Sequence, residues 1–391
     1  MTTTGASIAV IAPAPVPTAF GGAERLWWGL VDHLNRHTEH RAELIKLPTA
    51  ERNLTEILHG YERWAALDLS AYDAVVAGKY PAWMVEHPNL RVYLLHRLRG
   101  LYDTYALSGL PTHVQTADPD VKALDDHLRA TEGQRTALDE TFARARAIAT
   151  RPDLPPSLIG LPGSLTRRLV HWLDGVGLDA PGAVQQFSTL SQTVRDRPGS
   201  FPAGADVRVA HPMTDLQGLE PTGDGHLLAV SRLDRPKRLD LVIEAMAENP
   251  TIKLPLLVVG TGPEHDRLTQ LAAPDPRIRL LGHVNDDALV RLYNDARAVV
   301  FVPDQEDFGY ITLEAMLASK PVLTTTDAGG PTELVRDGVD GFITEPTPQA
   351  VGQALARLAQ DRRGARRMGR EARERVRGIG WHGLADAILA P

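Results

Sequence analysis

Two carboxylates in the segment 299–314 have a spacing that could serve one ligand. Glu306 lies in a loop that also contains Gly309, and Glu314 lies one turn into a helix expected to begin at Tyr310. The first N–H groups of a helix have no internal acceptor, and the helix dipole favours an anion there. Carboxylates cannot be phosphate ligands, but they accept hydrogen bonds from hydroxyl groups. The pattern therefore predicts a polyhydroxylated ligand that carries phosphate.

The plainer interpretation of such an acidic pair is an exposed loop and a helix glutamate paired with a lysine. Three further loops argue against it. A strand expected at 226–230 leads into the loop 231–238, which holds four cations, and glycine turns follow two other strands, at Gly260 with Gly262 and at 327–333. Arginine offers a bidentate fork and lysine a point charge, so the cationic loop predicts a diphosphate clamp.

These loops belong to a regular alternation of apolar strands and amphipathic helices in the second half of the chain. Strands are expected at 226–230, 256–260, 278–281, 298–302, 321–325 and 341–344, and helices at 239–248, 264–272, 286–296, 310–319 and 332–337. Such alternation predicts a parallel sheet covered on both faces, with ligands at the carboxyl ends of its strands. The four loops would then meet at one edge of one sheet.

The first half repeats the alternation with two candidate ligand contacts. Gly22 lies between the strand expected at 7–12 and the following helix, where it would let a ligand approach the backbone, although many such turns need only a positive φ. His96 ends the strand expected at 92–96, where its side chain would face the crevice; a lone histidine is more often structural. The segment 97–105 is rich in arginine and tyrosine, which suits sugar hydroxyls or an anionic acceptor.

The length of 391 residues allows two domains, and the polar, Gly/Pro-rich segment 216–225 marks the linker between them. We expect a domain at 1–215 with a helical insertion at about 110–175, a second domain at 216–376, and a C-terminal helix within 377–391.

The insertion contains a helix expected at 165–173, capped by Ser164 and ended by Gly175, with Trp172 among basic residues. Such a helix can lie on an anionic membrane, but it is more often an ordinary surface helix.

Composition narrows the possible functions. With 43% hydrophobic and 23% charged residues the chain is typical of soluble globular proteins, and its net charge of -7 argues against general nucleic-acid binding. The absence of cysteine excludes disulfides and thiolate chemistry and fits the cytosol. The N-terminus lacks the basic region of a signal peptide, and no apolar run reaches 18 residues. The pairs Asp118 with Asp120 and Asp304 with Glu306 are weak magnesium candidates, so we expect no metal.

The segments SRLDRPKRLDLVIEAM, VVGTGPE, LGHV, VPDQEDFGYITLEAM and KPVLTTTDAGGPTELV resemble the retaining glycosyltransferases of family 4. The resemblance is strong over 227–346 and weaker in the first half, where FGGAER and VYLLH carry it. It implies an α/β protein of the GT-B fold, with two Rossmann-like, doubly wound domains facing a central cleft. It also implies that the last helix crosses back to the N-terminal domain.

The resemblance implies a role for each charged candidate. Arg232 and Lys237 would hold the donor diphosphate and stabilise the departing nucleoside diphosphate. Glu306 would accept hydrogen bonds from the donor sugar, Glu314 would bind the ribose hydroxyls, and His96 would contact the transferred sugar. The implied catalytic residues are thus Arg232, Lys237, Glu306 and His96. The implied donor-binding residues, several of them through the backbone, are Gly22, Gly260, Gly262, Phe308, Gly309, Tyr310 and Glu314.

The reaction implied is retaining, metal-independent transfer from a nucleoside-diphosphate sugar, with no other cofactor. We expect a saccharide or lipid-linked saccharide acceptor in surface polysaccharide assembly, and a cytoplasmic enzyme that could touch the inner membrane face. One alternative is a glycosyltransferase for a small-molecule natural product such as an antibiotic. Others are an epimerase or phosphorylase of the same fold, and a non-catalytic subunit that binds nucleotide sugar.

Overall fold

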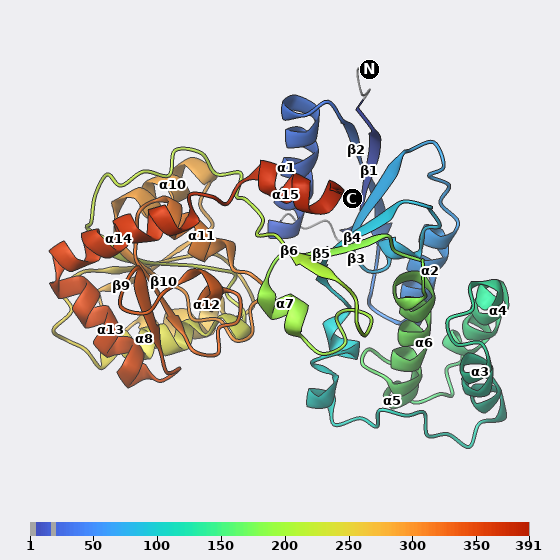
Figure 1. Cartoon of the computed structure of the whole chain (residues 1–391). Helices are drawn as coiled ribbons and strands as arrows, with labels where there is room; N and C mark the ends of the chain where they lie inside the picture. The colour runs from blue at the N-terminus through green and yellow to red at the C-terminus, as the bar shows by residue number, and fades with distance from the viewer. Residues whose placement is uncertain (1–4, 17–20, 391) are drawn as a thin grey trace. The chain divides into compact units, whose positions relative to one another are not determined.

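The computed structural model describes residues 5–16 and 21–390, and the chain divides into two compact units (Figure 1). Unit 1 comprises Met1–Leu190, Val194–Ala210 and Trp381–Pro391, and unit 2 comprises Ser191–Thr193 and His211–Gly380. Phe20, part of the FGGAER motif, lies outside the described residues.

Unit 1 is built on a six-stranded sheet of order β2-β1-β3-β4-β5-β6 in which all neighbouring strands are parallel. The strands are β1 (Ser7–Pro15), β2 (Arg41–Thr49), β3 (Ala74–Lys79), β4 (Leu90–His96), β5 (Gln186–Thr189) and β6 (Val207–Val209). The central strands read as continuous apolar runs because helices cover both faces of such a sheet. From β1 the chain adds β2 on one side and then the remaining strands on the other, so the switch point lies between β1 and β3. Doubly wound sheets bind ligands at such a switch point.

The helices of unit 1 include a helical insertion after β4. The helices are α1 (Gly22–His37), α2 (Leu54–Ala65), α3 (Pro119–Ala130), α4 (Leu138–Ala149), α5 (Pro156–Ile159), α6 (Ser164–Asp174), α7 (Gln192–Asp196), which runs across the boundary with unit 2, and α15 (Trp381–Leu389). Short 3-10 turns lie at Ala82–Met84, Arg99–Leu101, Tyr105–Ser108 and Arg135–Ala137.

The insertion is largely helical, as expected, and a turn in which Gly133 has φ 70° separates α3 from α4. One expectation is wrong: Ser164 is the first residue of α6 rather than its cap. Gly175 follows the last residue of α6, as expected, but it keeps helical angles and leads into a π-helix at Gly175–Asp179.

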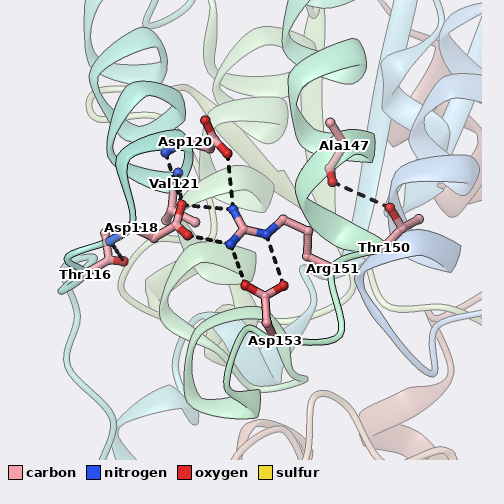
Figure 2. Close-up of polar contacts among 8 residues, drawn as sticks. All are labelled: Thr116, Asp118, Asp120, Val121, Ala147, Thr150, Arg151 and Asp153. Carbon is pink, nitrogen blue, oxygen red and sulfur yellow. Dashed lines mark hydrogen bonds and ion pairs between the residues drawn. The ribbon is translucent and has the colours of Figure 1, made fainter.

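One arginine joins the start of α3 to the segment that follows α4 (Figure 2). Arg151, just after α4, forms ion pairs with Asp118 at 2.6 Å, Asp120 at 3.3 Å and Asp153 at 2.5 Å. Asp118 also caps α3 by accepting from the N–H groups of Asp120 and Val121. Hydrogen bonding to the guanidinium lowers the pKa of Asp118. The acidic pair considered as a magnesium candidate is therefore occupied by a guanidinium group.

The last helix, α15, packs on unit 1 beside α1 (Figure 1). A Cβ on Gly29 of α1 would lie 2.3 Å from the Trp381 ring, so the two helices approach at a glycine. The Arg91 guanidinium of β4 donates to the carbonyls of Ile388 and Ala390, which fixes the end of α15. The expected return of the C-terminus to the first domain is present within this unit.

Unit 2 contains the second parallel sheet, of order β12-β11-β10-β7-β8-β9. Its strands are β7 (His226–Val230), β8 (Leu256–Val259), β9 (Ile278–Gly282), β10 (Ala296–Val300), β11 (Val322–Thr325) and β12 (Gly341–Thr344). Its helices are α8 (Leu239–Ala247), α9 (His265–Ala272), α10 (Asp286–Asp295), α11 (Tyr310–Leu317), α12 (Pro331–Leu334), α13 (Pro348–Gln360) and α14 (Arg362–Val376). A 3-10 turn lies at Arg235–Lys237.

The expected strand at 298–302 begins and ends two residues earlier, as β10. Phe301 and Val302 remain buried beyond the end of β10, and the Phe301 N–H still donates to the Leu323 carbonyl of β11 at 2.9 Å. The apolar run in the sequence therefore extends past the last residue of the strand. No helix among the described residues is both long and apolar enough to cross a membrane.

Candidate functional site

The second sheet has a doubly wound strand order. From β7 the chain adds strands β8 and β9 on one side and then β10, β11 and β12 on the other, so the switch point lies between β7 and β10. The loops that leave these two strands, 231–238 and 301–309, therefore border the crevice in which such sheets bind ligands. Both loops were singled out from the sequence, and the topology makes them neighbours. We call this place the donor crevice, after the ligand that the sequence resemblance implies; both of these loops belong to unit 2.

Lys237 and Glu306 form an ion pair across the donor crevice. Their side chains are 14% and 24% exposed, and the Lys237 ammonium also lies 5.7 Å from the centre of the Phe301 ring. A cation at that distance is attracted by the ring. The sequence suggested these two residues as separate ligands, for phosphate and for a sugar hydroxyl; the structure brings them together as partners.

The four cations of the loop after β7 divide into two kinds. Arg232 is 78% exposed and pairs with Asp234 at 3.1 Å, and Arg235 is 84% exposed and lies 3.7 Å from Glu264. Exposed pairs of this kind contribute roughly 0–1 kcal/mol, so a phosphate group could displace them at little cost. Both guanidinium groups are therefore accessible to a ligand.

Arg238 is different, and its assignment to the diphosphate clamp is wrong. Its guanidinium donates to both carboxylate oxygens of Asp327 at 2.7 Å, to the Val302 carbonyl at 2.8 Å and to the Pro303 carbonyl at 2.5 Å. Hydrogen bonding to Arg238 lowers the pKa of Asp327. The residue ties the loops after β7, β10 and β11 together, and no sequence signal separates it from its neighbour Lys237.

The glycines after β8 serve the close packing of two loops. Gly260 has φ 138°, and a Cβ there would lie 1.8 Å from the Ser231 carbonyl oxygen; a Cβ on Gly262 would lie 2.5 Å from the Leu233 carbonyl oxygen. The Leu233 N–H donates to the Thr261 carbonyl at 2.9 Å. These glycines therefore support the cationic loop, and their contact with a donor remains a prediction.

Helix α11 begins at the donor crevice. Gly309, its N-cap, has φ 80°, a conformation that favours glycine, and Phe308 is 1% exposed. Phe308 stacks on His211 at 5.3 Å and meets the edge of Tyr310 at 5.6 Å between ring centres. Its side chain thus belongs to the core, which leaves only its backbone for a ligand.

Several buried hydroxyl groups at this edge have no hydrogen-bond partner among the described residues. They include the Ser231 Oγ just after β7 and the Tyr310 hydroxyl at the start of α11. Burial raises the pKa of Tyr310, which keeps it protonated as a donor. Unpaired buried hydroxyls are uncommon and mark places where water or a ligand completes the bonding.

Glu314 is 9% exposed and is held by two side chains that the sequence analysis missed. The Thr214 hydroxyl donates to its Oε1 at 3.0 Å, and the Tyr293 hydroxyl donates to its Oε2 at 2.8 Å. Burial, followed by the Glu314 charge, raises the pKa of Tyr293 well above its usual value. No periodicity or motif marks either partner, since Thr214 lies just before the predicted linker and Tyr293 lies in the last turn of α10.

In unit 1 the predicted contacts lie along the carboxyl edge of the first sheet. Gly22 begins α1 after β1, and His96 ends β4, where its Nδ1 lies 2.7 Å from the Arg97 carbonyl oxygen. Lys79, at the end of β3, is the register partner of His96 and is half-buried. Lys79 was missed because a lone lysine after an apolar run carries no distinct signal.

A buried ion pair next to this edge was also missed. Lys46 of β2 pairs with Glu24 in the first turn of α1, which is 8% exposed. Burial, and secondarily the charge of Lys79, lowers the pKa of Lys46. A carboxylate is favoured near a helix N-terminus, which accounts for Glu24 at this position.

The segment 97–105 does not form the polar surface that its composition suggested. Arg97 is 6% exposed and donates to Asp179 and to the Ser200 carbonyl. The Tyr102 hydroxyl donates at 2.6 Å to Asp174, which is fully buried. A buried polar network of this kind is internally satisfied, so the expected acceptor contacts from Arg97 and Tyr102 are wrong.

The alternative of membrane contact through helix α6 is not supported by the structure. Trp172 is fully buried and donates to the Thr131 carbonyl at 3.1 Å, so it cannot insert into a membrane. His171 stacks on Tyr102 with ring centres 4.0 Å apart, and burial lowers its pKa to about 4. Among the residues that the structure describes, no three His, Cys, Asp or Glu side chains gather as a metal site would require.

Comparison with known proteins shows what this chain is similar to. Residues 215–375 match the model of the glycosyl transferases group 1. Among curated proteins, D-inositol 3-phosphate glycosyltransferase of Nocardia farcinica is 33% identical over 243 residues, which are 57% of this chain and 53% of that protein. The human alpha-1,3/1,6-mannosyltransferase ALG2 is 27% identical over 41% of this chain and 43% of its own length. The chain thus spans about half the length of these relatives.

Solved structures extend the likeness to the whole chain at low identity. Sucrose-phosphate synthase of Thermosynechococcus elongatus matches with a TM-score of 0.62 and 17% identity, over 97% of this chain and 96% of that chain. HepE of Anabaena, solved with UDP and glucose, matches with a TM-score of 0.56 and 18% identity, over 98% of each chain. These likenesses confirm the expected GT-B fold.

Proposed function

We propose that this chain, whose residues 215–375 match the model of the glycosyl transferases group 1, moves a sugar from a nucleoside-diphosphate sugar to a hydroxyl acceptor. The observation that carries the proposal is the ion pair of Lys237 with Glu306 at the switch point of a doubly wound sheet. A ligand with phosphate beside sugar hydroxyls satisfies both partners at once, because the phosphate takes the ammonium and a hydroxyl donates to the carboxylate.

The remaining contacts complete the donor site. Arg232 reaches the diphosphate from the exposed side, and the N–H groups at the start of α11, around Gly309, bind phosphate or sugar. Glu314, held by Thr214 and Tyr293, presents a fixed carboxylate to the ribose hydroxyls. His96 contacts the transferred sugar. The side chain of Phe308 takes no part, since it lies in the core.

The proposed transfer retains the anomeric configuration and uses no metal. The acceptor oxygen bonds to the anomeric carbon on the face from which the diphosphate leaves, and the bond from that carbon to the diphosphate breaks. The bonding pair stays with the diphosphate, and one of its oxygens takes the acceptor proton. Lys237 and Arg232 stabilise the negative charge that develops, which in enzymes is commonly the largest catalytic contribution.

The acceptor is proposed to be a saccharide or lipid-linked saccharide, with a small natural product as the alternative. Membrane contact through α6 is not part of the proposal, because Trp172 is buried. A panel of acceptors with one donor separates these cases. An epimerase would alter the nucleotide sugar without any acceptor, a phosphorylase would need free phosphate, and a binding subunit would hold the donor without turnover.

Calorimetric titration with nucleoside diphosphates and their sugars tests the donor site, starting with UDP and UDP-glucose. We expect Lys237→Ala to weaken binding about tenfold or more, since hydrogen bonds to charged groups contribute about 1.5–3 kcal/mol. Lys253→Ala removes the same charge from an exposed position of unit 2 and should leave binding unchanged. Equal binding by both variants would refute the assignment of Lys237. The anomeric configuration of the product, read by NMR, tests retention, and activity after chelation tests the absence of metal.

A further inference from the structure

A second group of cations lies at the opposite edge of the sheet in unit 2, where its strands begin. Lys320 precedes β11, Arg297 is the second residue of β10, and Asp224 precedes β7. Because all strands are parallel, their amino ends share one edge, and the donor crevice lies at the other. These three residues line one hollow together with Arg366 and Arg370 of α14. We call it the arginine hollow.

Two of its cations are buried with unused donors. Lys320 is 3% exposed and donates to the carbonyls of Gly223 at 2.9 Å and Asn294 at 2.7 Å, which accounts for two of its three N–H groups. Arg297 is 9% exposed and donates to the Ala359 carbonyl at 2.8 Å, while its buried Nε has no acceptor among the described residues. Buried donors without partners are costly.

The hollow carries an excess of positive charge. Asp224 is shared among Arg362 at 2.6 Å, Arg366 at 3.0 Å and Arg297 at 3.7 Å. Asp295, the other carboxylate that acts on Lys320, accepts a hydrogen bond from Thr222. Burial is the main cause that lowers the pKa of Lys320 to about 8, and the charges of Arg366 and Arg297 add to it. The interior of the hollow therefore favours an anion.

Arg370 connects the hollow to a largely basic face. It lines both the arginine hollow and the adjoining hollow that contains Arg373, Glu374 and Arg377, in which Glu374 pairs with Arg377 at 3.4 Å. Residues 366, 370 and 373 follow helical spacing, so they share one side of α14, and Arg377 directly follows the helix. Arg370 is exposed and has neither a hydrogen bond nor an ion pair with any described residue, so it needs no rearrangement to accept a ligand.

We propose that the arginine hollow is an anion site, separate from the donor crevice, for the phosphate group of a soluble ligand. Guanidinium forks from Arg366 and Arg370 would bind phosphate oxygens at the mouth, and the Lys320 ammonium would meet them at the base. The ligand supplies the acceptors that Lys320 and Arg297 lack. The headgroup of an anionic lipid also carries a phosphate group, and the experiment with vesicles described below distinguishes it from a soluble ligand.

The test is calorimetric titration of the full chain with inorganic phosphate. We expect saturable binding that Arg370→Ala weakens about tenfold, in line with the loss of one charge-assisted contact. Arg367→Ala removes the same charge from an exposed position of α14 that does not line the hollow, and should change nothing. Lys237→Ala should also leave phosphate binding intact, because it alters only the donor crevice.

Each other outcome overturns the proposal. The absence of saturable binding, or equal losses in Arg370→Ala and Arg367→Ala, would mean that the face attracts anions only through its general charge. Loss in Lys237→Ala alone would place the phosphate in the donor crevice. Sedimentation with phosphatidylglycerol vesicles that depends on Arg370, without binding of free phosphate, would assign the face to a lipid surface.

Discussion

Removal of one hydroxyl group, in Tyr293→Phe, should weaken both unit 2 and its donor site. The Tyr293 hydroxyl donates to Glu314 at 2.8 Å, and both side chains are at least nine-tenths buried. The variant leaves a buried carboxylate oxygen without its donor, at a cost of about 1.5–3 kcal/mol. For a unit of this size that corresponds to a fall in melting temperature of roughly 3–12 °C. Glu314 would also lose its fixed orientation, so KM for the donor should rise more than kcat falls.

A matched control exists in unit 1. The Tyr72 hydroxyl donates to Glu43 at 2.7 Å in an exposed position, so Tyr72→Phe removes the same type of bond where water can replace it. Two units need not unfold in one step, so hydrogen exchange read by mass spectrometry should follow each unit separately. If Tyr293→Phe and Tyr72→Phe destabilise their units equally, burial of Glu314 is not what makes the bond important.

Three further perturbations test other contacts. Gly260→Ala should destabilise unit 2 by more than about 2 kcal/mol, because its Cβ would overlap the Ser231 carbonyl oxygen, whereas Gly225→Ala, with open space around it, should have little effect in the same denaturant titration. Arg238→Lys keeps the charge but loses the planar fork, and should lower the melting temperature by several degrees at constant pH. The pKa of His171 is lowered to about 4 in the folded chain, so as pH falls the unfolded chain takes up this proton at a higher pH than the folded chain does. The free energy of unfolding of unit 1 should therefore decrease between about pH 6.5 and about pH 4, and it should decrease less in His171→Gln.

The alternation of strands and helices allowed the fold to be predicted. Parallel strands covered on both faces must be apolar throughout, so the strand at 226–230 was predicted at its exact bounds. The ends of strands were harder to predict, because buried apolar residues such as Phe301 and Val302 continue beyond the last residue of β10.

Side-chain roles were harder to predict than elements. Lys237 and Arg238 are adjacent cations, yet one faces the donor crevice and the other binds Asp327 beneath it, a difference set by the left-handed turn at Arg238. Local sequence does not encode which way such a turn points a side chain. Partners distant in sequence, such as Thr214 for Glu314, are likewise invisible until the fold brings them together.

The pairing of Lys237 with Glu306 bears on how the proposed donor site discriminates between ligands. In the absence of donor the two charges neutralise each other, so a bare phosphate must compete with a carboxylate for Lys237 and would leave Glu306 unpaired. A partly buried charge that loses its partner costs several times what an exposed one does. A nucleotide sugar avoids that cost, because its hydroxyl groups replace the ammonium as donors to Glu306. The resting ion pair therefore favours the intact donor over the nucleoside diphosphate left after transfer, which would promote release of the product.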